Sequence, residues 1–228
     1  MKSLNTDRKF LQFALQYLTP ERRELLESVV QMRTRRVTVV LEDIFRSHNA
    51  GAVLRSCDCF GVQDVHIIEN RNTWNHHPDI EQGSSKWLTI KRYNEKPQNT
   101  TDCLLSLRKK GYFIAATTPR SNQSIEDIPV DKPVALVFGT EMKGISDKVI
   151  DMADMTCRIP MFGFTESFNI SVAAAVSLHS LRQKLKTEAV PWKLTDDERT
   201  ELLLEWCGKV LKHFEHYEKA YREKKFNA

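Results

Sequence analysis

The sequence lacks the segments that would send a chain into or across a membrane. It has no run of about 18 apolar residues, and residues 1–10 lack the apolar stretch of a secretory signal. We therefore expect no membrane partner and a cytoplasmic protein. Cysteine is scarce, with five residues at irregular spacing and no CxxC pair. This pattern excludes a zinc finger and a disulfide framework, and it predicts reduced, mostly buried thiols and no metal site.

The glycine-rich loops of common nucleotide-binding folds are also missing. Dinucleotide-binding α/β proteins carry GxGxxG after the first strand, and phosphate-binding loops carry GxxxxGK[ST]. Here the apolar run ending at Leu41 is followed by Glu42-Asp43-Ile44, and the eight glycines are spread along the chain. A nucleotide-dependent oxidoreductase is therefore the weakest of the enzyme classes that we considered.

The excess of positive charge is small, because 34 Lys and Arg face 30 Asp and Glu for a net charge of +4. The distribution is more informative, since basic residues gather towards both ends of the chain. The candidate RNA-phosphate contacts are Arg22, Arg33, Arg35, Arg36, Lys219, Arg222, Lys224 and Lys225. The alternative interpretation is a set of solvated helix faces with no ligand.

Short β-branched apolar runs alternate with helical patterns, which predicts an α/β fold with a mostly parallel sheet. The predicted strands are 37–41, 65–68, 89–93, 112–117, 134–138 and 157–160. The predicted helices are 5–17, 20–33, 49–60, 101–110, 146–155 and 169–186. Strands that are almost wholly apolar are typical of a sheet covered on both faces.

We divide the chain into an N-terminal helical, RNA-binding extension (1–36), a catalytic body (37–186) and a C-terminal helical extension (187–228). A capping box at Thr195–Glu198 begins a predicted long final helix. Its apolar stripe must cover either this chain's core or a partner subunit; the stripe consists of Leu202, Leu203, Trp206, Val210, Phe214 and Tyr217. Residues 70–88 form a predicted polar loop, in which Trp74, His76 and His77 either stack on RNA bases or pack within the loop.

Polar residues cluster after three of the predicted strands, where open α/β sheets bind ligands. Asn49 and Arg55 follow the first strand, Glu141 follows the strand at 134–138, and Ser167 and Asn169 precede the helix at 169–186. Each also has an ordinary interpretation. An asparagine often caps a helix, an arginine often pairs with a surface carboxylate, and a glutamate in a loop is often only a charge.

Taken together, the three clusters resemble the three motifs of the SpoU/TrmH branch of the SPOUT RNA methyltransferases. Asn49 and Arg55 match the first motif, N-x-(G/A)-x-x-x-R. Gly139, Glu141 and Gly144 match the second, G-x-E-x-x-G. The third, I-P-M…S-L-N-V-S-x-A, is matched by Ile159, Pro160, Met161, Ser167, Asn169, Ser171 and Ala173. Phe168 and Ile170 replace the usual leucine and valine, and Phe168 alters the expected cofactor pocket.

The resemblance implies a parallel sheet with a C-terminal deep trefoil knot, flanked here by helical extensions, and a homodimer with its active site at the subunit interface. It implies S-adenosylmethionine as the cofactor, bent in the knot loops. The implied cofactor-binding residues are Thr117, Gly139, Glu141, Gly144, Ile159, Met161, Ser167, Phe168 and Asn169. The implied catalytic residues are Arg55, Asn49, Glu141, Ser167 and Asn169.

The implied reaction is methyl transfer to a ribose 2′-hydroxyl, a weak nucleophile that must lose its proton. Two roles are open for Arg55. Under the field of an RNA phosphate it accepts the proton transiently, or it stays cationic and stabilises the forming alkoxide while another group takes the proton. Helical extensions at both ends resemble the members that methylate guanosine 18 in the tRNA D loop. The alternatives are rRNA or another tRNA ribose as substrate, and a non-catalytic RNA-binding protein.

Overall fold

The computed structural model describes residues 4–44, 46–74, 83–140 and 142–226. The chain divides into two compact units, one formed by residues 34–192 and the other by residues 1–33 together with 193–228. We call the first the body and the second the terminal unit. The sequence analysis treated the two flanks as separate extensions. In the structure they fold together, because helices from both flanks contribute to one apolar core.

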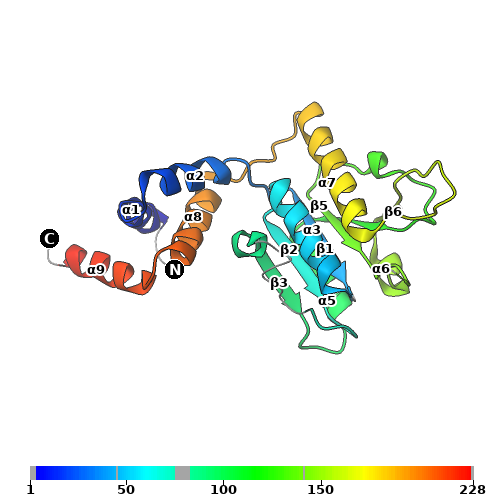
Figure 1. Ribbon diagram of the computed structural model, residues 1–228, viewed down its shortest axis with the longest axis horizontal. Helices are drawn as coiled ribbons and strands as arrows, with labels where there is room; N and C mark the ends of the chain where they lie inside the picture. The colour runs from blue at the N-terminus through cyan, green and yellow to red at the C-terminus, as the bar shows by residue number, and fades with distance from the viewer. Residues whose placement is uncertain (1–3, 45, 75–82, 141, 227–228) are drawn as a thin grey trace. The chain divides into compact units, whose positions relative to one another are not determined.

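A parallel sheet forms the centre of the body, and within the described residues it has six strands (Figure 1). Their order is β3-β2-β1-β5-β4-β6, and every neighbouring pair runs parallel. The strands are β1 (Val37–Glu42), β2 (Asp64–Ile68), β3 (Thr89–Tyr93), β4 (Phe113–Thr117), β5 (Val134–Phe138) and β6 (Met155–Cys157). The predicted α/β class with a parallel sheet is confirmed.

Strand β1 shows why the apolar runs were diagnostic. All six of its residues are buried, because it lies between β2 and β5 and has helices on both faces. The one hydroxyl within the run is satisfied, since Thr38 Oγ1 donates to the Asp64 carbonyl oxygen at 2.6 Å. A buried hydroxyl without such a partner would be costly, so this hydrogen bond lets a polar residue stand in a central strand.

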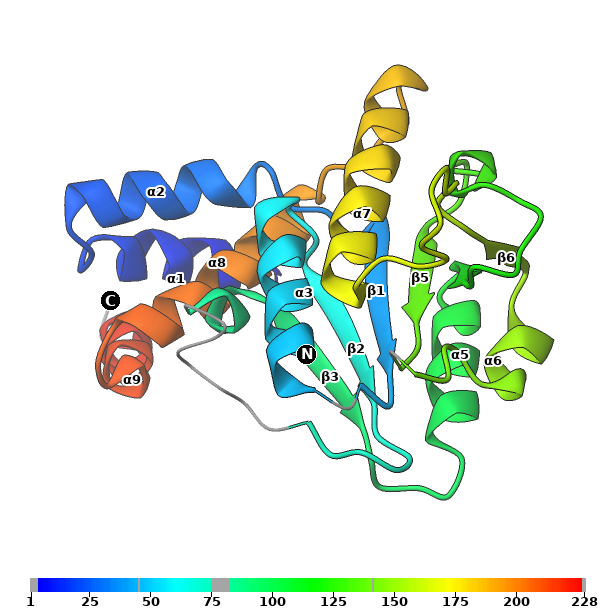
Figure 2. The same ribbon diagram turned by 45° about the vertical axis from the view of Figure 1, so that its right-hand side comes forward.

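Among the residues that the structure describes, two α-helices cover each face of the sheet. Figure 2 shows α3 (Ser47–Cys59) and α7 (Ile170–Thr187) side by side in front of it, while α5 (Asn99–Lys109) and α6 (Asp147–Met152) pair on the opposite face. Helix α7 buries an aliphatic stripe at helical spacing: Ala174, Leu178, Leu181 and Leu185. The short 3₁₀ helices η1 (Ser84–Trp87) and η2 (Ile125–Asp127) were not predicted.

The terminal unit is built from α1 (Leu4–Leu15), α2 (Pro20–Val30), α8 (Asp196–Val210) and α9 (Phe214–Phe226). Its buried side chains come from both flanks and include Leu11, Leu15, Leu26, Val30, Leu202, Leu203 and Trp206. The predicted capping box is present, since the Thr195 hydroxyl accepts from the Glu198 N–H and the Glu198 carboxylate accepts from the Thr195 N–H. An ion pair between Arg8 and Asp197 at 2.6 Å also joins the two flanks.

The prediction of one long final helix was wrong. The helix stops at Val210, and His213 adopts a left-handed backbone with φ of 57° before α9 begins. Gly208 permits this arrangement, because a Cβ at this position would lie 3.3 Å from the Phe214 ring. The Phe214 ring then packs against Phe10 of α1, with ring centroids 5.5 Å apart. The apolar residues keep their helical spacing across the break, so this spacing could not reveal the break.

The cysteines agree with the sequence analysis. All five are free thiols, and Cys57, Cys103, Cys157 and Cys207 are buried. Burial raises the pKa of Cys103 and of Cys157 to about 12, so these thiols are poor nucleophiles at neutral pH. Among the described helices, none combines the length and the apolar character that a membrane crossing requires.

Candidate active site at the carboxyl ends of the strands

The three sequence clusters follow strands in one half of the sheet, in the order β1-β5-β4-β6. The first follows β1 and the second follows β5, which is its direct neighbour; Thr117 ends β4, and the third cluster follows β6. In a parallel sheet the carboxyl ends share one edge, and the order of this sheet reverses between β1 and β5. Such a reversal is where open α/β sheets place their ligands.

A hydrogen bond joins the first cluster to the third. Asn169 Nδ2 donates to Asn49 Oδ1 at 3.3 Å, across 120 positions of sequence. Asn169 is also the N-cap of α7, because its Oδ1 accepts from the Ser171 N–H at 2.9 Å. Asn169 therefore caps helix α7 and also contacts a residue of the first cluster. Asn49 is buried within the first turn of α3, where the N-cap is Arg46.

Arg55 lies on the exposed side of α3, and no carboxylate among the described residues pairs with it. Ser167 and Phe168 are also exposed, in the loop between β6 and α7. A guanidinium that is exposed and has no acidic partner remains available for a phosphate or a developing oxyanion. Within the described residues, Arg55 therefore does not form the surface ion pair that was its ordinary interpretation.

The segment Gly139–Gly144 forms a closed turn after β5. The N–H of Thr140 donates to the Gly144 carbonyl at 2.9 Å, and the N–H of Gly144 donates to the Thr140 carbonyl at 2.8 Å. A Cβ at position 139 would lie 2.1 Å from the Gly144 oxygen, and Gly144 has φ of 70°. Both positions therefore require glycine for steric reasons. Glu141, the predicted acid of this turn, lies outside the described residues.

Three further predicted cofactor residues border the same region. Thr117 is half-buried at the end of β4, and its hydroxyl donates to the Val137 carbonyl at 2.9 Å. Ile159 and Met161 are half-buried after β6. The three loops that the resemblance assigns to the cofactor thus leave the sheet from neighbouring strands. Within the described residues no group of His, Cys, Asp or Glu side chains could hold a metal ion.

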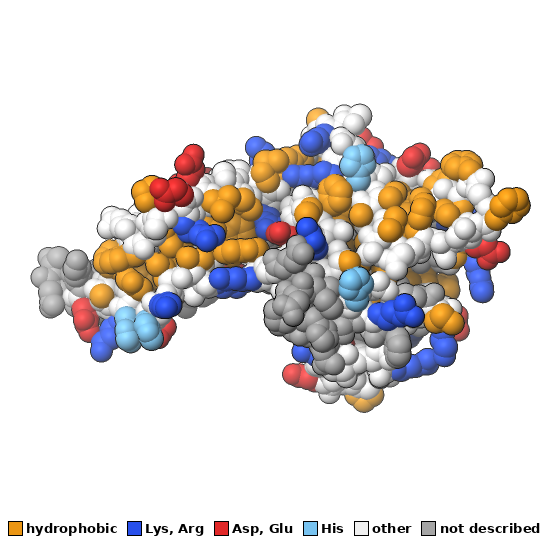
Figure 3. All heavy atoms as spheres, viewed as in Figure 1, with side chains coloured by type: hydrophobic (Ala, Val, Ile, Leu, Met, Phe, Trp, Pro, Cys, Tyr) orange, Lys and Arg blue, Asp and Glu red, His pale blue; other side chains and the backbone are white. Residues whose placement is uncertain are grey.

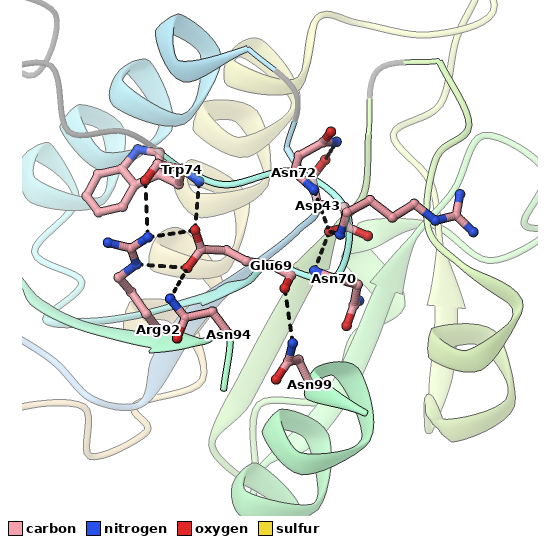
Figure 4. Close-up of polar contacts among 9 residues, drawn as sticks. Asp43, Glu69, Asn70, Asn72, Trp74, Arg92, Asn94 and Asn99 are labelled. Atoms are coloured by element: carbon pink, nitrogen blue, oxygen red, sulfur yellow. Dashed lines mark hydrogen bonds and ion pairs between the residues drawn. The ribbon is translucent and has the colours of Figure 1, made fainter. Parts of the chain in front are cut away.

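Beside this region, a carboxylate network fixes the loop that follows β2 (Figure 4). The Glu69 side chain is 3% exposed and pairs with Arg92 at 2.7 Å. It also accepts from the Trp74 N–H at 2.7 Å and from Asn94 Nδ2 at 3.1 Å. Burial pushes the pKa of Glu69 upward, but the hydrogen bonds and the charge of Arg92 outweigh burial and lower it. Glu69 is therefore an ionised anchor for the start of the loop predicted at 70–88.

The acidic pair after β1 was missed as a functional feature. Asp43 has a positive φ of 52°, and its Oδ1 accepts from the N–H groups of Asn70 at 2.6 Å and Arg71 at 2.8 Å (Figure 4). Its neighbour Glu42 is 3% exposed. The available signal was the occurrence of two acids directly after a buried strand, where a charge is costly unless it is bonded.

The predicted phosphate contacts fall into two groups. Arg22, Lys219 and Arg222 are exposed on the terminal unit. The other arginines bind within the chain, since Arg33 is 2% exposed above the Trp206 ring, Arg35 pairs with Asp64, and Arg36 donates to the carbonyls of residues 130 and 131. The side chains of Lys224 and Lys225, like His76 and His77, lie outside the described residues. Trp74 is buried beneath the Arg92 guanidinium.

Comparison with known proteins matches residues 36–179 to the SpoU rRNA Methylase family. The match includes the whole region from β1 to the middle of α7, with all three motifs. The chain belongs to the SpoU methylase family. The family resemblance inferred from the motifs is thereby confirmed.

Relatives of this SpoU family member extend the similarity beyond the body. The chain is 37% identical over 204 residues to a tRNA (guanosine(18)-2′-O)-methyltransferase of Borreliella burgdorferi, covering 89% of this chain and 91% of that protein. A solved structure, the A. aeolicus TrmH/SpoU tRNA modifying enzyme, superposes with a TM-score of 0.74 at 26% identity, over 84% of this chain and 98% of that one. The SpoU methyltransferase AviRb of Streptomyces viridochromogenes, solved with AdoMet, shares the fold with a TM-score of 0.60 at 22% identity, over 70% of this chain and 62% of that one.

Proposed function

We propose that this SpoU family member transfers the methyl group of S-adenosylmethionine to the ribose 2′-hydroxyl of guanosine 18 in the D loop of tRNA, in the cytoplasm. The observation that carries the proposal is the 37% identity to a tRNA (guanosine(18)-2′-O)-methyltransferase over nearly the full length of both chains. The similarity includes both the motif region and most of the terminal unit. A relative that shared only the body would support methyl transfer without indicating an RNA.

The residues around the turn suit an adenosine-type cofactor. Ile159, Met161 and Phe168 leave apolar surface partly exposed in the segment after β6, and an adenine ring requires such a surface. Backbone groups of the turn and of the β6–α7 loop supply the polar contacts, so no charged anchor is needed. When bound, S-adenosylmethionine supplies an electrophilic methyl group on a sulfonium.

Arg55 and the two asparagines then act on the RNA. Arg55 is cationic and solvent-facing, so it binds the phosphate beside the target ribose and stabilises negative charge as the 2′-hydroxyl loses its proton. The hydrogen bond from Asn169 to Asn49 fixes the start of α7 against the start of α3. This bond holds the helix that bears Arg55 at a set position relative to the cofactor loop, and proximity of this kind is a large part of transfer catalysis.

The proposal includes a homodimer formed through α7 and the loop before it. Hydrophobic side chains gather on this face of the body (Figure 3). They include Phe162 at 97% exposure and Phe164 at 108%, and also Phe168, Val172 and Val176. Large apolar side chains this exposed are typical of an interface. Because Arg55 lies on the neighbouring helix α3, a second copy seated here would complete the site from the other side.

The exposed basic residues of the terminal unit are the proposed tRNA-backbone contacts. Lys219 and Arg222 stand on the outer side of α9, each within reach of a glutamate one turn away. Such exposed pairs are weak and exchange readily for a phosphate. Arg33, Arg35 and Arg36 are bound within the chain in this structure, so we assign the backbone contacts to Arg22, Lys219 and Arg222.

The knot is also part of the proposal. It is supported by the path of the chain, which leaves the edge strand β6, crosses the cofactor side in the loop 158–169, and returns to α7 beside α3 on one face of the sheet. An experimental electron-density trace through residues 113–187 would test it, because a chain that does not thread through a loop would rule it out.

The deciding experiment is methyl transfer from labelled S-adenosylmethionine to unmodified tRNA, with mapping of the labelled nucleotide. The matched control is the same tRNA with a 2′-deoxyguanosine at position 18, which lacks only the acceptor oxygen. We expect label at guanosine 18 and none in the control. Equal labelling of the two tRNAs, or labelling of rRNA in preference to tRNA, would overturn the assigned substrate while leaving the chemistry in place.

A further inference from the structure

Glu42 is a buried carboxylate that the reaction itself does not use. It ends the central strand β1 and is 3% exposed. Its oxygens accept from the Thr100 hydroxyl at 2.7 Å, the Ser146 hydroxyl at 2.8 Å and the Ser146 N–H at 2.9 Å. Within the described residues no cationic side chain pairs with it. A buried charge held only by hydrogen bonds is costly, so its position calls for an explanation.

The partners of Glu42 connect it to the turn Gly139–Gly144. In the sheet register Leu41 pairs with Phe138, so Glu42 lies beside the point where β5 ends and the turn begins. Ser146 follows the turn by two residues and caps α6, since its hydroxyl accepts from the Val149 N–H at 3.3 Å. The turn is therefore held at its first residue by the sheet and just past its last residue by Glu42.

The neighbouring acid, Asp43, binds a different loop from Glu42. Asp43 follows Glu42 directly, and its backbone leaves the strand with a positive φ. Asp43 accepts from the loop after β2 (Figure 4), whereas Glu42 accepts from the segment after β5. Asp43 thus holds the loop after β2, whereas Glu42 holds the segment after β5 and also binds Thr100, which accepts from Asn70 Nδ2.

We infer that Glu42 is a positioning residue for S-adenosylmethionine, which acts through Ser146 by fixing the turn Gly139–Gly144 in its cofactor-binding conformation. The inference rests on the proposed function for the identity of the ligand. Two hydrogen bonds from one serine to one carboxylate define both the place and the direction of the chain as it leaves the turn. The bonds are part-buried and end on a carboxylate, so they are stronger than the turn's own pair of neutral backbone bonds.

Glu42→Gln is the first test, because it keeps the shape, removes the negative charge and replaces one acceptor oxygen with an amide donor. We expect the dissociation constant of S-adenosylmethionine, measured by calorimetry on the full chain, to rise about tenfold or more. In tRNA methylation, KM for S-adenosylmethionine should rise by a similar factor, with kcat at saturation changed about twofold at most. Ser146→Ala keeps one of the two bonds at an exposed position and should give a smaller rise, of about threefold.

Glu69→Gln is the matched control. Glu69 is also a buried carboxylate and directly follows the neighbouring strand β2, but its partners Arg92, Trp74 and Asn94 do not belong to the turn. The Glu69→Gln variant should be destabilised as Glu42→Gln is, but it should bind S-adenosylmethionine with the affinity of the wild type. Equal weakening in both variants would reduce Glu42 to a purely structural role, and wild-type affinity in Glu42→Gln would remove it as a positioning residue.

Hydrogen exchange of the amides in 140–146 separates this inference from the proposed function. These amides should exchange faster in the Glu42→Gln variant than in the Glu69→Gln variant, with or without any ligand. A wild-type chain that binds no S-adenosylmethionine would refute the proposed function, and faster exchange in Glu42→Gln alone would still uphold the anchoring of the turn. Unchanged exchange in Glu42→Gln would overturn the anchoring itself, whatever the protein binds.

Discussion

The body and the terminal unit bury their apolar residues by different means. In the body, aliphatic strands are covered on both faces and the polar loops gather at one edge of the sheet. In the terminal unit, the two ends of the chain meet through aromatic rings. Phe10 and Phe13 of α1, and Tyr17 just after it, pack against Phe214, Tyr217 and Tyr221 of α9. The first arrangement concentrates loops around a site, and the second presents charged helix faces to solvent. Chemistry and RNA affinity should therefore be separable by mutation.

Arg55→Ala in the body should have the largest effect. We expect methyl transfer to fall by roughly 10²–10³-fold or more, because the variant removes the cation that stabilises the developing alkoxide. Folding and S-adenosylmethionine affinity should be unchanged, since Arg55 is exposed. Single-turnover assays at saturating tRNA and cofactor measure the effect. Arg55→Lys keeps the charge without the guanidinium, and a fully active lysine variant would show that the charge suffices without the planar guanidinium.

Acid should destabilise the body through His66. Burial, with the charges of Lys110 and Lys91, lowers the pKa of His66 to about 4 from its ordinary 6.5. The unfolded chain therefore takes up a proton below pH 6.5 that the folded chain resists. Stability is full above pH 6.5 and falls as the pH drops towards 4, by up to about 3 kcal/mol.

Denaturant titrations at several pH values measure this loss. His66→Asn places an amide near the Nδ1 that contacts the Tyr93 hydroxyl at 3.2 Å, but it cannot titrate. Its stability should vary much less between pH 6.5 and 5.5, a range above the ordinary carboxylate pKa values of about 4. An equally steep curve in the asparagine variant would assign the pH dependence to other groups.

Removal of residues 193–228 should disable the terminal unit and spare the body. Leu11, Leu15 and Leu26 would lose the helix that covers them. The two ends of the body would stay joined, because Thr34 Oγ1 donates to the Trp192 carbonyl at 2.5 Å. We expect tRNA affinity in filter binding to fall roughly 30-fold, the scale of a few lost phosphate contacts. S-adenosylmethionine binding should persist. Its loss on truncation would show that the body depends on the terminal unit.

Neutralising Arg22, Lys219 and Arg222 together should have the smallest effect. Loss of three phosphate contacts should weaken tRNA binding several-fold near physiological salt and make the slope of log K against log salt shallower by about 2–3. The control is Lys132→Ala, an exposed lysine that precedes β5 at the other end of the strand from the site. An unchanged slope in the triple variant would remove these residues from the tRNA interface.

The patterns that the sequence predicted well depended on local chemistry. Residues 37–41 could only suit a strand covered on both faces, and Thr195 with Glu198 could only begin a helix. The sequence did not predict the break between α8 and α9. The break involves Gly208, His213 and the contact of Phe214 with Phe10, and none of these changes the apolar period. The arginines at 33, 35 and 36 looked alike as a charge cluster, but the structure places each against a different partner within the chain.

By itself the sequence determined the fold class, the family and the residues of the motifs, because apolar periods and motif spacing are local in the chain. Only the tertiary structure decided which of those residues meet. The strand order sets β1 beside β5, and this brings Asn49 to Asn169 and Glu42 to Ser146 across more than 100 positions. The physical reason is that strand pairing and helix packing act between residues that are distant in sequence, so a buried carboxylate becomes informative only when its partners are known.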